Sequence, residues 1–221
     1  MFVAQPERWV VKGGVALILR LDPNRTSNDI DLTYVAEAGE HAVALRALAE
    51  AAAHDLDDFF SFEVARGAAE EIDLDHPLER ALSVPVVARV GRAVFAEFSV
   101  DLALPRVDAL SVELLPEAGA LTGLAEVDAV GAVTVLTLPA QIADKVCAIF
   151  ERHGDGAARS SRSRDLADIA MIATQEDVDG TALAEELRRE ERRRRAAVSL
   201  LEPLPAGMSL PSGQAAEWRR R

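Results

Sequence analysis

The feature that most constrains the fold is a glycine pair, Gly13-Gly14, followed further along the chain by Asp29 and Asp31. The aspartates stand among β-forming residues, with Ile30 between them and Leu32 after them. Because side chains alternate between the two faces of a strand, both carboxylates face one way while Ile30 and Leu32 face a core. The pattern therefore predicts a helix that begins at the glycines and a strand that carries both carboxylates.

Two carboxylates on one strand face indicate a divalent cation. The two positions lie roughly 7 Å apart on an extended strand, so the charges repel, and neither packing nor neutral hydrogen bonding requires this arrangement. Mg²⁺ prefers carboxylate oxygens and brings phosphate oxygens with it. A glycine pair at a helix start offers unhindered backbone N–H groups and the positive end of the helix dipole to phosphates. Metal-assisted chemistry on a phosphate is therefore expected.

Four stretches of the chain together resemble a known enzyme family. They are Trp9–Leu17, Arg25–Leu32, Leu138–Lys145 and Arg162–Ile169. The first two are similar to the opening motif of the DNA polymerase β-type nucleotidyltransferase superfamily. The whole set resembles the AbiEii/AbiGii (MenT-like) family of nucleotidyltransferase toxins within that superfamily.

The resemblance implies a metal site built from three carboxylates. Asp29 and Asp31 would hold Mg²⁺ (or Mn²⁺), and an acidic residue on a neighbouring strand would complete the site. Asp101 fits that place, late on the strand expected over residues 93–104, and could accept the proton of the attacking hydroxyl; Glu97 is the weaker candidate. The alternative interpretation of Asp101 is an exposed strand aspartate.

The downstream stretches imply two further catalytic residues. Lys145 would place its positive charge beside a phosphate group of the substrate. Asp165 would be a catalytic acidic residue at the start of a helix. The alternative for Lys145 is a surface lysine paired with Asp144 or Glu151. The alternative for Asp165 is a first-turn carboxylate that complements the helix dipole.

The expected phosphate-binding residues are Gly13, Gly14, Arg25, Ser27 and Lys145. Arg25 and Ser27 match the family's Arg-x-Ser-x-Asp pattern and either orient phosphates or hold the loop. Superfamily members usually carry Ser or Thr at the glycine pair, where its hydroxyl touches phosphate. This chain has Val15 there, which leaves phosphate binding to backbone N–H groups.

The charge distribution bears on whether the chain binds nucleic acid. The chain has 24 basic and 37 acidic residues and a net charge of −13, which by itself would repel nucleic acid. However, Arg159, Arg162 and Arg164 cluster beside the second motif and are the expected RNA-binding residues. A second arginine-rich run, 188–195, either holds RNA or a triphosphate or forms a solvated helix face.

The expected fold class is α+β, with a mixed β-sheet nucleotidyltransferase domain over residues 1–137 and a helical C-terminal lobe over residues 138–221. Helices are expected over residues 14–21, 39–56, 141–153, 163–172 and 180–201, and strands over residues 29–35, 60–65, 83–90, 93–104 and 133–136. The segment 106–130 carries no clear pattern.

The expected location is the cytoplasm. The single cysteine, Cys147, cannot form an internal disulfide, which fits a reducing compartment. Residues 1–8 lack the apolar stretch of a signal peptide, and no apolar run reaches membrane-spanning length, so no membrane association is expected.

The sequence favours a toxin of a toxin–antitoxin pair, with a cognate antitoxin protein as partner. The expected activity is metal-dependent transfer of a nucleoside monophosphate from an NTP to an RNA acceptor, with the 3′ end of tRNA as the first choice. One alternative keeps the chemistry but uses a protein hydroxyl or a small molecule as acceptor. The other is a catalytically degenerate binding module.

Overall fold

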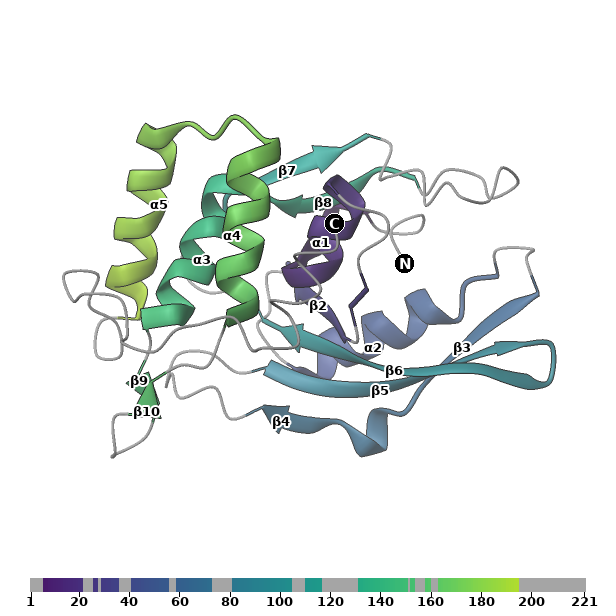
Figure 1. The fold of residues 1–221 in the computed structure, drawn as a ribbon. Coiled ribbons are helices and arrows are strands. Elements are labelled where there is room, and N and C mark those ends of the chain that lie inside the picture. The colour runs from purple at the N-terminus through teal and green to yellow at the C-terminus, as the bar shows by residue number, and fades with distance from the viewer. Residues whose placement is uncertain are drawn as a thin grey trace. The chain divides into compact units, whose positions relative to one another are not determined.

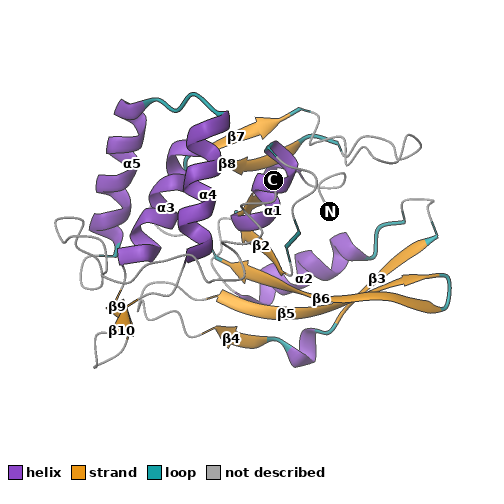
Figure 2. Cartoon of the chain, viewed as in Figure 1, coloured by secondary structure: helices purple, strands orange, loops and turns teal. Residues whose placement is uncertain are grey.

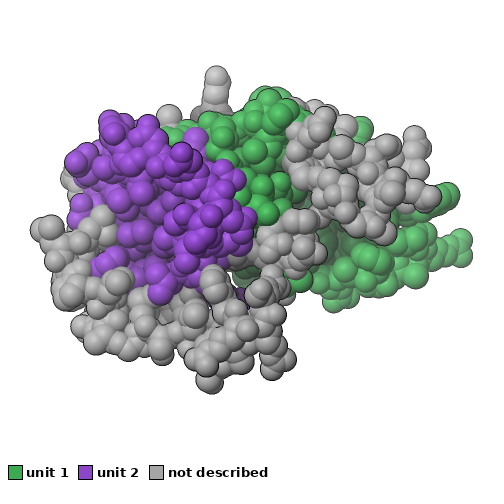
Figure 3. All heavy atoms as spheres, turned by 45° about the horizontal axis from the view of Figure 1, so that its top comes forward, with its two compact units in different colours: residues 1–136 green, residues 137–221 purple. Residues whose placement is uncertain are grey.

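The structure is a computed structural model of the chain, and it divides into two compact units, residues 1–136 and 137–221 (Figure 3). It describes residues 6–21, 26–27, 29–35, 41–55, 59–72, 81–104, 110–116, 131–150, 152–153, 158–159 and 163–194. Residues 1–136 are called unit 1 and residues 137–221 unit 2, and each unit is described by itself.

Unit 1 is built on an eight-stranded mixed sheet (Figures 1 and 2). Its strands are β1 (Trp9–Lys12), β2 (Asp29–Tyr34), β3 (Phe60–Val64), β4 (Glu70–Ile72), β5 (Ala81–Val90), β6 (Ala93–Ala103), β7 (Val112–Leu115) and β8 (Val133–Leu136). The strand order is β3-β5-β6-β2-β1-β8-β7, and β4 pairs with β5. The pairs β2/β6 and β1/β8 are parallel, whereas the other pairs are antiparallel.

One face of this sheet forms the core of unit 1. Leu32 on β2 and Leu102 on β6 lie directly opposite each other and are fully buried. The neighbouring strands add Val11 and Val84 to the same core cluster. Alternation along β2 and β6 then places the aspartates of these strands on the other face, as the pattern predicts.

Two helices complete the core. The helix α1 (Gly13–Arg20) follows β1 without a loop and buries Ala16 and Leu17, whereas α2 (His41–Ala52) buries a stripe of small and aliphatic residues. At the end of α1, Arg20 donates to the carbonyl of Leu136 and to Glu113, which fixes the helix against β8 and β7. Of two short 3-10 turns, η1 (Pro6–Arg8) precedes β1 and η2 (Arg66–Ala68) connects β3 to β4.

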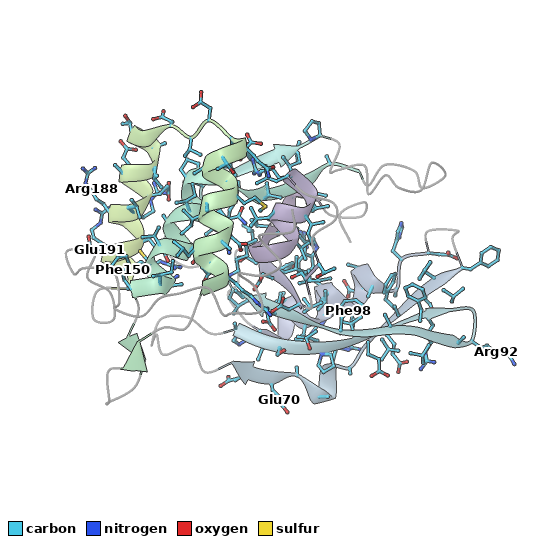
Figure 4. All side chains as sticks on the ribbon, in the orientation of Figure 1. Glu70, Arg92, Phe98, Phe150, Arg188 and Glu191 are labelled. Atoms are coloured by element: carbon cyan, nitrogen blue, oxygen red, sulfur yellow. The ribbon has the colours of Figure 1, made fainter. Side chains whose placement is uncertain are left out.

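The strands β5 and β6 form a long hairpin around Gly91-Arg92, as the sequence predicts. Gly91 has φ of +57°, a conformation that glycine adopts without a steric penalty. Arg92 points away from the sheet at the tip of the hairpin (Figure 4).

Unit 2 consists mainly of three helices, α3 (Leu138–Phe150), α4 (Ser163–Gln175) and α5 (Gly180–Arg193). The helix α3 packs against both α4 and α5 (Figure 1). Asp179 caps α5 by accepting hydrogen bonds from the backbone N–H groups of Thr181 and Ala182. A two-stranded ribbon, β9 (Arg152–His153) with β10 (Ala158–Arg159), lies between α3 and α4 in the sequence.

Part of the arginine-rich run is engaged within unit 2. Arg193 and Arg194 both pair with Glu190 of their own helix and with Asp144 of α3, so these charges stabilise helix packing. Arg188 is exposed and points away from α5 (Figure 4).

The α+β fold class is confirmed, and several boundaries differ from those expected. The strands β1, β4 and β7 were not predicted, because each is four residues or shorter and carries little period-2 signal. The helix α3 ends at Phe150 rather than near His153, since residues 152–153 pair with β10 instead. The helix α5 ends at Arg193, and residues 195–201 of the predicted helix lie outside the described residues.

No helix within the described ranges is both long enough and apolar enough to span a bilayer.

A pair of leucine substitutions tests which face of the sheet holds the core. We expect Leu102→Ala to lower the free energy of unfolding by about 2–5 kcal/mol, because it leaves a cavity between β2 and β5. Leu114 on β7 is 58% exposed, so Leu114→Ala is the matched control. We expect it to change stability by less than about 0.5 kcal/mol in urea unfolding. Equal effects of the two substitutions would contradict the assigned core.

Candidate functional site

The pairing of the strands places four polar side chains in one row across the sheet of unit 1. Lys12 on β1 is opposite Asp31 on β2, Asp31 is opposite Asp101 on β6, and Asp101 is opposite Ser83 on β5. Directly paired residues share a sheet face, so all four lie on the face that is not the core. We call Lys12, Asp31, Asp101 and Ser83 the polar row.

Asp29 extends this row along β2. It lies two residues before Asp31, so it shares the same face, and it is opposite Ser99 of β6. Asp29 is exposed, and its Oδ1 accepts a hydrogen bond from Ser27 Oγ at 3.1 Å. Ser27 therefore orients the Asp29 carboxylate. This contact favours the interpretation in which Ser27 holds the loop.

Gly13 lies against the Asp31 carboxylate. Its φ is +63°, in the left-handed region that side chains disfavour. A Cβ atom at this position would lie 2.8 Å from the Asp31 carboxyl carbon and closer still to its Oδ2. Only glycine therefore fits, and the backbone at the start of α1 approaches the carboxylate as closely as the chain allows.

The residue at the N-cap of α1 does not cap the helix with its side chain. Lys12 occupies the N-cap position in an extended conformation, and its side chain makes no capping hydrogen bond. Val15 packs its side chain against the core cluster rather than replacing the hydroxyl of the superfamily pattern. The first backbone N–H groups of α1 are thus the anion-binding groups that this helix end provides.

The donor set fits a divalent cation that is also held by substrate. Asp31 and Asp101 are half-buried and directly opposite each other in the parallel pair β2/β6. Within the described residues, no three His, Cys, Asp or Glu side chains are grouped closely enough to hold a metal ion. Mg²⁺ is usually bound by one or two carboxylates together with substrate phosphates rather than by a closed protein cage. The carboxylates of β2 and β6 match that mode of binding.

Unit 2 contains a buried ion cluster. Lys145 of α3 is 7% exposed, and its Nζ donates to Asp165 Oδ1 at 2.9 Å and to Asp168 Oδ2 at 2.7 Å. Both aspartates belong to α4, so the cluster joins the two helices. Asp144, the surface partner considered for Lys145, instead binds Arg193 and Arg194.

The environment holds Lys145 in its charged form. Burial by itself lowers the pKa of Lys145, because a low-dielectric surrounding disfavours the ammonium. The negative charges of Asp165 and Asp168, with the hydrogen bonds that they accept, outweigh burial and raise the pKa above 10.5. Lys145 is therefore a permanent cation at neutral pH.

Asp168 is the residue of this cluster that the sequence analysis missed. It is 4% exposed, more buried than Asp165, and it makes the shorter bond to Lys145. The signal was present, because Asp165 and Asp168 are spaced i, i+3 and therefore share a helix face.

The remaining predicted residues are only partly covered by the structure. Arg25 and Arg162 lie outside the described residues, and for Arg159 the description is limited to its backbone in β10. Arg164 is exposed on the first turn of α4. That the polar row of unit 1 and the Lys145 cluster of unit 2 serve one site stays a prediction.

The ion cluster can be tested through stability. We expect Lys145→Met to destabilise the protein by about 3–5 kcal/mol, because the buried Asp168 and the partly buried Asp165 lose their countercharge. Arg188→Met, on the exposed side of α5, is the control and should cost less than about 0.5 kcal/mol in the same unfolding experiment.

The same cluster predicts a pH dependence. The folded pKa of Lys145 is raised, so its stabilisation is complete below pH 10.5 and is lost as pH rises through the folded value. We therefore expect the difference between wild type and Lys145→Met to stay constant from neutral to mildly alkaline pH and to shrink as the pH becomes strongly alkaline. A difference that vanished near neutral pH would contradict the cluster.

Comparison with solved structures supports the fold. MenT4, a nucleotidyltransferase toxin from Mycobacterium tuberculosis H37Rv, aligns with a TM-score of 0.55 at 20% identity, over 90% of this chain and 61% of that chain. JHP933 from Helicobacter pylori aligns with a TM-score of 0.43 at 19% identity, over 77% of this chain and 60% of that chain. The likeness to MenT4 shows the fold, whereas the second score is too low to support an argument.

Comparison of sequences identifies the family. No curated protein matches the chain. A family model described as the nucleotidyl transferase AbiEii toxin of a type IV TA system matches residues 1–221, the entire chain. The protein therefore belongs to the AbiEii family of nucleotidyltransferase toxins.

Proposed function

We propose that this toxin transfers a nucleoside monophosphate from an NTP to an RNA acceptor, in a reaction that depends on Mg²⁺ or Mn²⁺. The 3′ end of tRNA is the first candidate for the acceptor. Family membership supports nucleotidyl transfer as the reaction class. The close approach of the Gly13 backbone to Asp31 is the observation that most directly supports unit 1 as the location of the reaction, because it brings the start of α1 next to a pair of carboxylates.

The residues of unit 1 can each be given a part in this reaction. The hydroxyl oxygen of the acceptor forms a bond to the α-phosphorus while the bond to the β-phosphate oxygen breaks, and pyrophosphate leaves. Asp101 would take the hydroxyl proton. Backbone N–H groups at Gly13-Gly14 bind phosphate oxygens. Asp31 and Asp101, with Asp29 beside them on β2, would hold the metal together with phosphate oxygens of the substrate, and the metal would supply Lewis-acid stabilisation of the charge that develops on those oxygens.

The proposal also includes partners and a compartment. The type IV toxin–antitoxin description of the family supports a cognate antitoxin protein as a partner. NTP and RNA are both cytoplasmic molecules, so the toxin is proposed to act in the cytoplasm. Lys145 and Asp165 are proposed to act on the same substrate, with Lys145 as a fixed charge for phosphate and Asp165 as a catalytic acidic residue.

The carboxylate assignment predicts the effect of one isosteric substitution. We expect Asp31→Asn to lower the rate of transfer from labelled NTP to total RNA by about a hundredfold or more, because several kcal/mol of transition-state stabilisation are removed. Asp177→Asn, at an exposed position after α4, is the matched control and should leave the rate unchanged. Circular dichroism would verify that both variants are folded. Full activity in folded Asp31→Asn protein would refute the metal assignment.

The acceptor can be tested through the arginines that precede Asp165. If the acceptor is RNA, transfer should fall steeply with salt, because each neutralised phosphate releases counterions. Charge reversal at Arg162 and Arg164 should reduce RNA modification severalfold while NTP binding stays near wild type. Arg92→Glu is the control, since Arg92 is exposed in the turn between β5 and β6 and belongs to neither arginine-rich stretch.

The same assay separates the competing functions. A protein or small-molecule acceptor would show little salt dependence and no effect of the double reversal at Arg162 and Arg164. A degenerate binding module would transfer no label to any acceptor while still binding NTP.

A further inference from the structure

Among the four residues of the polar row, Lys12 is the one that carries a positive charge. It is the last residue of β1 and is directly opposite Asp31 in an antiparallel pair, so the two Cβ atoms are about 5 Å apart on the same face. The half-buried Lys12 immediately precedes Gly13, whose backbone lies against the same carboxylate. Its side chain therefore projects from the edge of the proposed phosphate-binding turn.

The ammonium of Lys12 has no partner among the residues that the structure describes. No hydrogen bond or ion pair joins it to Asp31 or to any other described side chain, and it makes no capping bond to α1. The other inward-facing cations differ, because Arg20 binds Glu113 and Lys145 binds two aspartates. The unpaired ammonium of Lys12, beside the start of a helix, has unused donors where an anion would lie.

The order of the residues in the polar row indicates which part of the substrate lies near Lys12. Asp101, Asp31 and Lys12 follow one another across β6, β2 and β1. Neighbouring strands are about 4.8 Å apart, so Lys12 and Asp101 stand on either side of Asp31, roughly 10 Å from each other. In-line displacement has the attacking oxygen on one side of the α-phosphorus and the leaving oxygen on the other. With the proton acceptor Asp101 at one end, the leaving group belongs at the Lys12 end.

We propose that Lys12 binds the β- and γ-phosphates of the NTP and neutralises the charge on the departing pyrophosphate. This inference rests on the proposed function, because it assigns the two ends of the same site. Lys12 is a compact point charge with three donors, which suits a phosphate whose orientation changes as it leaves. A surface lysine without a function would be the contrasting interpretation.

The experiment measures binding of magnesium pyrophosphate to the full-length protein by calorimetry. Lys12→Met should weaken pyrophosphate binding about tenfold or more, because one charge-assisted hydrogen bond is lost. Lys12→Arg should retain most of the affinity. Arg92→Met removes a cation at the hairpin tip and should have no effect (Figure 4). The affinity for a nucleoside monophosphate should be unchanged in all three variants, since it lacks the phosphates assigned to Lys12.

Three results would overturn the role of Lys12. They are wild-type pyrophosphate affinity in Lys12→Met, equal losses for pyrophosphate and nucleoside monophosphate, and absence of pyrophosphate binding by the wild type. Transfer assays on the same preparations separate the two proposals. A wild type that binds pyrophosphate through Lys12 but modifies no acceptor would contradict the proposed function alone. A wild type that modifies RNA while Lys12→Met binds pyrophosphate normally would contradict the role of Lys12 alone.

Discussion

The contact between the Gly13 backbone and the Asp31 carboxylate is the constraint on which the rest of unit 1 depends. It requires a residue without a Cβ atom, a φ of +63° and a helix that begins directly at the end of β1. The antiparallel pairing of β1 with β2 then fixes which residues stand beside the carboxylate. A single steric condition therefore brings together a helix N-terminus, a lysine and an acidic strand, three features that a nucleotide with bound metal would use.

The opposite face of the sheet explains why these charges can be held close together. Like charges on adjacent strands destabilise a sheet, and Asp31 and Asp101 are direct neighbours. Leu32 and Leu102, each next in sequence to one of these aspartates, are fully buried on the core face. Burial of such side chains contributes roughly 1.5–3 kcal/mol each, which offsets the repulsion. In unit 2 the single positive charge of Lys145 instead lies between the two negative charges of Asp165 and Asp168 and forms a hydrogen-bonded ion pair with each.

Much of the fold follows from local patterns in the sequence. The alternation around Asp29 and Asp31, the turn at Gly91 and the apolar periodicity of α2, α3 and α4 predict elements that the structure contains. Pairing between distant strands is not a local property, so the position of Lys12 opposite Asp31 could not be predicted. The four-residue strand β1 gives too short a pattern for that purpose. Asp168 is a different case, because its i, i+3 spacing from Asp165 is a local pattern and could have been recognised in the sequence.

The central claim is that the carboxylates of β2 and β6, beside Gly13, form the reaction centre of a nucleotidyltransferase. The most direct measurement is anomalous diffraction from crystals of the protein with Mn²⁺ and a non-hydrolysable NTP analogue. The account predicts an anomalous peak in contact with Asp31, near Asp101, with the triphosphate reaching toward the start of α1. A well-ordered nucleotide whose metal lies away from Asp29, Asp31 and Asp101 would contradict it.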